Sequence, residues 1–331
     1  MARFVDAYKR KIDYLRISVT DRCNLRCVYC MPPEGIDLME SAGILRYEEF
    51  LRIARIAVAH GVSKIRITGG EPLVRKGIVE FLHSLASLDG LKDLSLTTNG
   101  VLLKDYAARL KEAGLSRVNV SLDSLKRDRF LKMTRGDNLQ QVLDGLDEAV
   151  KIGLTPVKIN MVAIKDFNDD EIIDFARLSL FKPYHVRYIE YMPFNTQEGW
   201  QRDKCISAAA MKDIIEKGVG PLEPVPEEKG AAGPARRYRF KGAPGEVGFI
   251  SPVSEHFCGS CNRLRLTSDG KLRNCLFSDK EIDLRGPIRE GSGDEVIEEL
   301  LFKAVMEKPE GHHINENVFK KCSRTMSLIG G

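Results

Sequence analysis

The chain alternates short runs of β-forming residues with longer segments of helical periodicity. The short runs predict β-strands at 14–20, 64–68, 94–98, 117–122, 156–162 and 185–191. Helical patterns separate them, at 47–60, 78–88, 102–113, 139–152 and 170–180. This strict alternation predicts an α/β fold with a parallel sheet and right-handed crossovers.

Within the predicted strands, apolar residues occupy one face and polar residues the other. In the first strand, Leu15, Ile17 and Val19 alternate with Arg16 and Ser18. A doubly wound sheet is apolar on both faces, so a polar face favours a barrel whose interior holds a polar ligand. An antiparallel sheet with one solvent-exposed face gives the same alternation, but the intervening helices disfavour an antiparallel sheet. Six strand–helix units instead of eight predict an incomplete (βα)6 TIM-like barrel, open on one side.

After Met192 the pattern changes. Residues 218–234 are rich in proline and glycine and predict a loop. We expect short strands at 238–240 and 246–251, then a helix over about 294–307. The chain is therefore predicted to have two domains, a barrel over 1–195 and a C-terminal extension over 196–331.

Composition narrows the class of protein. The 331 residues, 43% of them hydrophobic, can bury a large core, and a net charge of +4 is too small to predict nucleic-acid binding. No apolar stretch is long enough to cross a bilayer, and the N-terminus lacks the apolar core of a signal peptide. Eight cysteines without a secretion signal favour a reducing compartment, and we expect the cytoplasm.

Three cysteines, Cys23, Cys27 and Cys30, share a loop directly after the first strand. Thiolates suit iron–sulfur clusters and zinc equally well. Three ligands would leave one iron of a four-iron cluster open to another ligand, as in a catalytic metal site. Spacing alone also allows half of a zinc site or a disulfide switch, but the position at the carboxyl end of a strand favours catalysis.

A second group of three cysteines lies in the C-terminal part, at Cys258, Cys261 and Cys275. Spacing alone favours zinc here, with His256 as the nearby candidate for a fourth ligand. Arg263 and Arg265 follow Cys261 at strand spacing and so point the same way. Such a pair can bind a triphosphate through forked, charge-assisted hydrogen bonds.

Cations also occur on the inward face of the predicted barrel, at Arg16, Arg66 and Lys158. Two such charges about 4 Å apart repel by about 4 kcal/mol at an effective dielectric constant of about 20. They must therefore pair with protein carboxylates or bind an anionic substrate. Glu190 is the one carboxylate that we expect on this face, so a phosphate-bearing substrate is favoured over ion pairing.

The run DRCNLRCVYCMP resembles the cluster loop of the radical S-adenosylmethionine (SAM) enzymes. Within that superfamily it is similar to the GTP 3′,8-cyclase family of molybdenum cofactor biosynthesis. The turn TGGEP at 68–72 resembles the motif that binds the amino group of SAM. The segment CGSCNRLRLTSDGKLRNCLFS and the terminal Gly-Gly are similar to the C-terminal motifs of that family.

The resemblance implies the ligands and the binding residues. Each cysteine group would hold a 4Fe–4S cluster, the first cleaving SAM to a 5′-deoxyadenosyl radical and the second binding the guanine of GTP. The residues implied for SAM are Tyr29, Gly70, Ser121 and Met192. Those implied for GTP are Arg16, Arg66, Thr97, Lys158, Arg263 and Arg265, and the tail residues Gly330 and Gly331 would reach the active site. Tyr29 would pack against the adenine of SAM or contact it through its backbone, and the alternative is simple packing in the wall. Without the resemblance, Met192 belongs to the core.

The activity implied is the cyclisation of GTP to 3′,8-cyclo-7,8-dihydro-GTP, by a monomer or homodimer. The implied partners are a reducing electron donor and the cyclic pyranopterin monophosphate synthase, with no nucleic acid and no membrane. One alternative is a peptide-modifying radical SAM enzyme with auxiliary clusters, which has no use for the inward cations. The other is a non-enzymatic zinc-ribbon protein that binds nucleic acid.

Overall fold

The structure is a computed structural model that describes residues 3–192, 202–226, 233–312 and 324–330. All six predicted strands are present, with ends within two residues of the prediction. They are β1 (Tyr14–Ser18), β2 (Lys64–Thr68), β3 (Asp93–Thr98), β4 (Arg117–Ser121), β5 (Val157–Ala163) and β6 (Tyr184–Glu190).

The five predicted helices are also present, to within two residues. They are α1 (Tyr47–Ala59), α2 (Ile78–Ala86), α3 (Leu103–Glu112), α5 (Leu139–Lys151) and α6 (Ile172–Phe181). The sequence analysis missed α4 (Arg127–Thr134), which precedes α5 in the connection from β4 to β5. Its eight residues bury only Phe130, Met133 and Thr134, so its apolar periodicity is weak.

One twelve-stranded sheet contains both parts of the chain. Its order is β12-β11-β10-β1-β2-β3-β4-β5-β6-β9-β8-β7. The strands from the C-terminal part are β7 (Glu223–Pro224), β8 (Arg236–Arg239), β9 (Glu246–Ile250), β10 (Arg263–Leu266), β11 (Lys271–Arg273) and β12 (Ile282–Asp283). β10 runs parallel to β1, and β9 runs parallel to β6.

The sheet curves but does not close, because β12 and β7 end it and do not pair within the described part of the chain. The predicted incomplete α/β barrel is therefore confirmed. The C-terminal strands lengthen its wall at both edges, an arrangement that the sequence analysis did not predict. The domain boundary at 195 stays a prediction.

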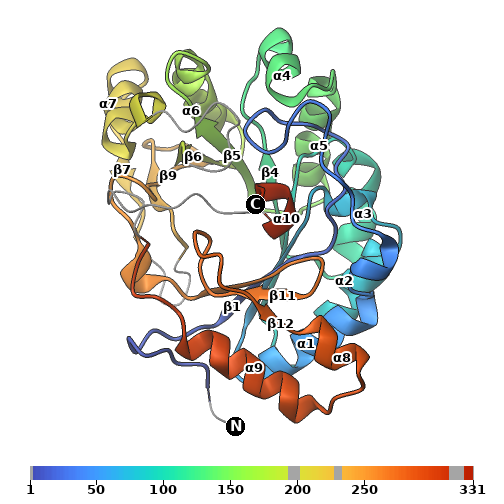
Figure 1. The fold of residues 1–331 in the computed structure, drawn as a ribbon. Coiled ribbons are helices and arrows are strands. Elements are labelled where there is room, and N and C mark those ends of the chain that lie inside the picture. Colours follow the sequence, from blue (N-terminus) through green and yellow to red (C-terminus); the bar gives the residue numbers. More distant parts are fainter. Residues whose placement is uncertain (1–2, 193–201, 227–232, 313–323, 331) are drawn as a thin grey trace.

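Helices cover the outer face of the curved sheet (Figure 1). The apolar residues of the strands face these helices: Leu15, Ile17, Ile65 and Ile67 are completely buried in the core between them. From the C-terminal part, α7 (Ala208–Gly218) contacts α6, and α9 (Asp294–Met306) contacts α1 beside α8 (Arg285–Arg289).

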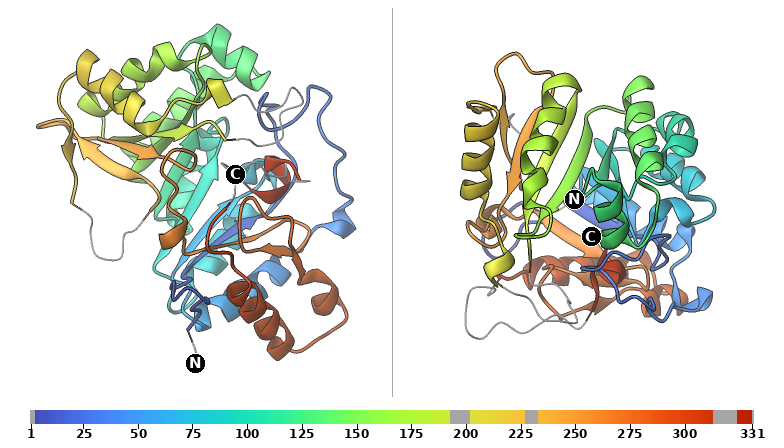
Figure 2. Two further views of the ribbon diagram at one scale, coloured as in Figure 1. Left: turned by 60° about the vertical axis from the view of Figure 1, so that its left-hand side comes forward. Right: turned by 90° about the horizontal axis from the view of Figure 1, so that it is seen from above.

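The short helix α10 (Met326–Ile329) lies on the inner side of the sheet, where Figures 1 and 2 show it near the C-terminus. None of the helices formed by the described residues has the length and apolar character needed to cross a membrane.

Candidate active site

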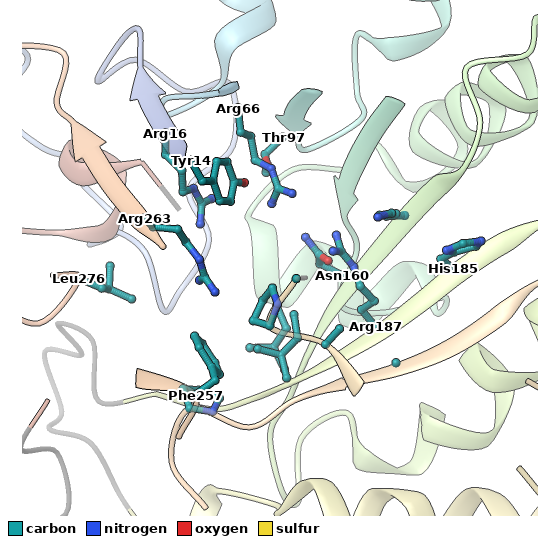
Figure 3. A pocket seen from close by; sticks show the side chains of 18 of the residues that line it. Tyr14, Arg16, Arg66, Thr97, Asn160, His185, Arg187, Phe257, Arg263 and Leu276 are labelled. Atoms are coloured by element: carbon teal, nitrogen blue, oxygen red, sulfur yellow. The ribbon is translucent and has the colours of Figure 1, made fainter. Parts of the chain in front are cut away.

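The inner face of the sheet encloses a cavity of about 1240 Å³. The polar residues of the strands line it, including Arg16, Arg66, Thr97 and Lys158, so their predicted inward direction is confirmed (Figure 3). Pockets for a single small ligand are usually about 300–1000 Å³. The cavity therefore has room for more than one molecule.

Positive charge dominates the wall of this cavity. Among the described residues that line it, three are acidic, Asp93, Asp123 and Glu246, and eleven are basic. The basic residues are Arg16, Lys64, Arg66, Arg117, Lys158, Arg187, Arg237, Arg239, Arg263, Arg265 and Lys308. Strand parity could have found Lys64, Arg117 and Arg187, because each is two residues from an inward position. Lys308 lies outside the strands, and nothing in the sequence marked it.

Glu190 does not face the cavity, so this prediction is wrong. Its buried carboxylate accepts hydrogen bonds from the backbone N–H groups of Ala208, Val253 and Ser254, each over 2.9 Å, and from the Ser254 hydroxyl. Inward positions on β6 are odd-numbered, His185, Arg187 and Ile189, whereas residue 190 is even-numbered. Glu190 instead joins the end of β6 to the C-terminal part.

Two of the three carboxylates that line the cavity, those of Asp93 and Glu246, already have cationic partners. Asp93 binds Arg117 through two contacts of 2.5 Å. Glu246 contacts Arg237, Arg239 and His185 at 2.9, 2.8 and 3.2 Å. The described wall therefore carries far more basic side chains than acidic ones, and its positive charge is not balanced by its carboxylates.

The ionisation of the inward cations reflects this imbalance. Burial, together with the nearby Arg187 and Arg117, lowers the pKa of Lys158 to about 6. Burial lowers the pKa of Arg187 to about 9, with a further contribution from Arg66. Burial and the charge of Arg263 lower the pKa of Arg265 to about 10. A bound anion relieves both the desolvation and the repulsion.

Several neutral groups on the same wall lack partners. The buried atoms Tyr14 OH, Thr97 Oγ1 and Asn160 Oδ1 form no hydrogen bond with any residue that the structure describes. Buried polar groups in folded proteins are almost always paired. The wall therefore fits a ligand that is both anionic and rich in hydrogen-bonding atoms.

The first cysteine loop follows β1 and is fixed to the end of α4. The backbone N–H groups of Arg26 and Val28 donate to Thr134 O and Met133 O, both over 2.9 Å. Burial raises the pKa of Cys30 to about 12, and nearby Cys23 contributes. Burial and the neighbouring Cys30 raise the pKa of Cys27 well above its usual range. The thiol groups of this loop therefore affect one another electrostatically.

Tyr29, between two of these cysteines, lines the cavity, whereas the three cysteines do not. Its hydroxyl donates to the Asp123 carboxylate over 2.5 Å, and Asp123 also accepts from the Val162 N–H over 2.8 Å. Burial raises the pKa of Asp123 to about 6. Tyr29 thereby ties the cysteine loop to Asp123, which follows β4, and Ser121 and Met192 line the same cavity.

Gly70 lies where the turn after β2 meets the cysteine loop. A Cβ atom there would lie 2.4 Å from Arg22 O and 2.8 Å from Asp21 O, so only glycine permits this approach. The next residue, Glu71, is buried, and burial raises its pKa to about 7. Its carboxylate accepts from the Asn99 N–H over 2.7 Å, and Asn99 Nδ2 lies 3.7 Å from Cys23 Sγ.

The second cysteine group lines the cavity: Cys258, Cys261 and Cys275 are all part of its wall. Burial raises the pKa of Cys261, but Lys308 and Arg263 outweigh it, and the net shift is downward. Lys308 Nζ donates to the carbonyl oxygens of Arg263 and Asn274 over 2.9 and 2.5 Å. Positive charge thus favours the thiolate that a metal needs.

Three thiolates are a donor set that suits a four-iron cluster. In the described ranges, no three histidine, cysteine or acidic side chains converge on a site for one metal ion. His256, the candidate zinc ligand, contacts the ring of His312, with centroids 5.3 Å apart. In a four-iron cluster each cysteine binds a different iron, so the sulfur atoms stand farther apart than around one ion.

The end of the chain connects the two cysteine loops. Ser327 of α10 lies near the Cys30 sulfur, where its backbone and hydroxyl oppose the rise in the pKa of Cys30. Ile329 packs against Leu276 and Phe277, which follow Cys275. Gly330 O accepts a hydrogen bond from Arg265. Gly331 lies outside the described residues.

This fold and this site define a radical SAM protein: a three-cysteine loop follows the first strand of an open parallel barrel. The family described as Radical SAM superfamily matches residues 17–179, and the family described as Molybdenum Cofactor Synthesis C matches residues 184–314. The crystal structure of SuiB from Streptococcus suis has the same fold. It aligns with a TM-score of 0.63 and 14% identity over 97% of this chain and 79% of its own.

Relatives along the whole chain identify the family more closely. GTP 3′,8-cyclase from Thermodesulfovibrio yellowstonii is 51% identical over 327 residues, which are 98% of this chain and 99% of its own. The protein of the same name from Pelotomaculum thermopropionicum is 50% identical over 326 residues, with the same coverage. The chain belongs to the family of GTP 3′,8-cyclases, radical SAM enzymes of molybdenum cofactor biosynthesis.

Proposed function

We propose that the cavity binds GTP together with SAM and that the chain converts GTP to 3′,8-cyclo-7,8-dihydro-GTP. The observation that carries this proposal is the cavity itself, with eleven described basic residues and three acidic ones on its wall. The names of the curated relatives supply the substrate. A peptide substrate would leave most of this buried positive charge unmatched.

SAM would occupy the end of the cavity beside Tyr29, Gly70, Ser121 and Met192. A 4Fe–4S cluster would be held by Cys23, Cys27 and Cys30, behind Tyr29. When bound, this cluster and SAM supply the radical that takes a hydrogen atom from C3′ of the ribose. A second 4Fe–4S cluster, on Cys258, Cys261 and Cys275, would hold the guanine at the opposite wall.

The residues of the chain would hold the nucleotide in the shape that ring closure requires. Arg16, Arg66, Lys158, Arg263 and Arg265 would bind the triphosphate, and Thr97 would accept or donate a hydrogen bond. Fixing both ends of the nucleotide brings C3′ of the ribose and C8 of the guanine together, and such orientation can supply about 7–11 kcal/mol of a reaction barrier. The tail residues Gly330 and Gly331 would cover the nucleotide beside Arg265.

The proposal extends to the partners of the reaction. SAM cleavage consumes one electron, and a second electron with a proton must replace the hydrogen atom removed from C3′, because the product has the mass of GTP. A reducing donor must therefore reach the N-terminal cysteine loop. The product would pass to the cyclic pyranopterin monophosphate synthase in the cytoplasm, and the chain would act as a monomer or homodimer.

The test is anaerobic incubation of the iron-loaded protein with SAM, a reductant and GTP, followed by mass spectrometry. The expected product has the mass of GTP, and a carbon–carbon bond joins C3′ to C8. Cleavage of SAM without any cyclised nucleotide would overturn the proposal and leave only the superfamily assignment.

A further inference from the structure

Tyr14 lines the cavity. Its hydroxyl is one of the unpaired groups named above, and the proposed function gives it no role. Tyr14 begins β1, in register with Lys64 of β2 and Arg263 of β10. Its side chain extends into the cavity between Arg16 and Arg66 (Figure 3). The ring therefore lies among the cations of the wall.

The Tyr14 hydroxyl is buried and has no hydrogen-bond partner in the part of the chain that the structure describes. A buried tyrosine hydroxyl normally finds a partner, because an unpaired one destabilises the fold. Tyr188, which is completely buried, follows this rule, since its hydroxyl donates to Ile172 O over 2.6 Å. An unpaired hydroxyl on the wall of a ligand cavity is best explained by a ligand.

The charges around the hydroxyl indicate which part of a ligand it meets. The guanidinium carbon of Arg66 lies 5.5 Å from the centre of the Tyr14 ring. Burial raises the pKa of Tyr14, but Arg66, Arg16, Arg263 and Arg117 together outweigh it and lower the pKa. Arginine side chains only donate hydrogen bonds, so a ligand atom shared by them and Tyr14 is an acceptor. An anionic oxygen fits this position best.

We infer that Tyr14 is a substrate-binding residue whose hydroxyl donates a hydrogen bond to a phosphate oxygen of the nucleotide, among Arg16, Arg66 and Arg263. This inference rests on the proposed function, since it takes GTP as the ligand. The guanidinium groups supply charge, whereas the neutral phenol supplies a bond of fixed direction. Tyr14 would thereby select the orientation of the phosphate chain.

The test compares Tyr14→Phe with Tyr188→Phe in the iron-loaded protein under anaerobic conditions. GTP binding is measured by equilibrium dialysis, with inorganic triphosphate as a competitor, and unfolding midpoints are measured without nucleotide. We expect Tyr14→Phe to bind GTP and triphosphate about tenfold more weakly, the loss expected for one hydrogen bond to a charged group. Its unfolding midpoint equals or exceeds that of the wild type, because the hydroxyl that is removed has no partner in the free protein.

Tyr188→Phe should show the opposite pattern, with unchanged GTP affinity and a lower unfolding midpoint. The inference is overturned if Tyr14→Phe binds GTP as tightly as the wild type, or if its unfolding midpoint falls. Unchanged competition by triphosphate alongside weaker GTP binding would place the hydroxyl at the nucleoside and would also overturn it. If the wild-type protein itself does not bind GTP, the proposed function fails, and the inference fails with it.

Discussion

Nη1 of Arg265 donates a hydrogen bond to the backbone oxygen of Gly330 over 2.7 Å. This contact joins β10, a wall strand of the cavity, to the C-terminal end of the chain. Gly330 has φ +74° and lies against the ends of β1 and β2. A Cβ atom on it would lie 2.2 Å from Thr68 Oγ1 and 3.0 Å from Ser18 Cβ.

Gly330→Ala should therefore displace the tail. We expect formation of the cyclised nucleotide to fall by roughly ten- to a hundredfold, the effect of a misplacement of about 1 Å. SAM cleavage without cyclisation should continue, because the N-terminal cysteine loop is unchanged. The measurement is product formed and SAM cleaved in the same anaerobic assay.

Gly242→Ala is the matched control for this substitution. Gly242 has φ +75°, but a Cβ atom on it would meet nothing within 4 Å. It carries the same backbone strain without the crowding. Equal losses of product in the two variants would show that backbone strain alone is responsible.

Replacing Cys258, Cys261 and Cys275 together by alanine should halve the iron content. We expect about four iron atoms per chain instead of about eight, as two four-iron clusters require. SAM cleavage should persist, and cyclisation should be lost. Cys205→Ala, which changes a half-buried cysteine in neither group, should leave the iron content unchanged. An unchanged iron content in the triple variant would refute a C-terminal cluster.

GTP binding should be accompanied by proton uptake at Lys158. In the free protein its pKa is about 6, so the side chain is neutral at pH 8. A bound triphosphate raises this pKa, so the complex holds more protons and the affinity for GTP increases as the pH falls from about 9 to 6. Calorimetry at pH 8 in buffers of different ionisation enthalpy should detect close to one proton per site.

Lys158→Met should bind GTP more weakly and without this proton uptake. Lys241→Met, at an exposed position outside the cavity, should behave as the wild type does. If the measured enthalpy is independent of the buffer in the wild type, Lys158 is already charged before GTP arrives, and the prediction is wrong.

Glu190→Ala should destabilise the protein. It removes the acceptor of three backbone N–H groups and one hydroxyl. Since an unsatisfied buried donor costs about 1–3 kcal/mol, we expect the free energy of unfolding to fall by about 3 kcal/mol or more. Denaturant titration measures this loss.

Glu255→Ala is the control for this prediction, because Glu255 is half exposed and its carboxylate pairs, among the described residues, with Arg236 alone. A surface ion pair contributes less than about 1 kcal/mol. Equal effects of the two substitutions would mean that Glu190 does not hold the C-terminal part to β6.

Strand parity allowed much of the cavity wall to be predicted. The alternation of Leu15, Arg16 and Ile17 distinguishes the face under the helices from the face inside, because only one face can be apolar in such a barrel. The same rule was applied wrongly to Glu190, which alternates with His185 and Arg187 and so shares the face of the apolar Val186 and Tyr188. A shift of one residue exchanges the two faces.

Other features had no local signal. The pairing of β10 with β1 joins residues about 250 positions apart, and strand propensity carries no information about such a partner. Lys308 approaches Cys261 from the segment after α9, so tertiary packing alone brings them together. The cysteine motifs were easier to find, because Cys23, Cys27 and Cys30 lie within one loop and their spacing is visible in the sequence.

The position of β9 and β10 has a consequence for synthesis on the ribosome. When β6 emerges, the first six strands have a backbone edge on each side that nothing yet covers, at β1 and at β6. Such edges are templates for aggregation. Both edges therefore stay open to pairing with other chains until residues 246–266 have been translated.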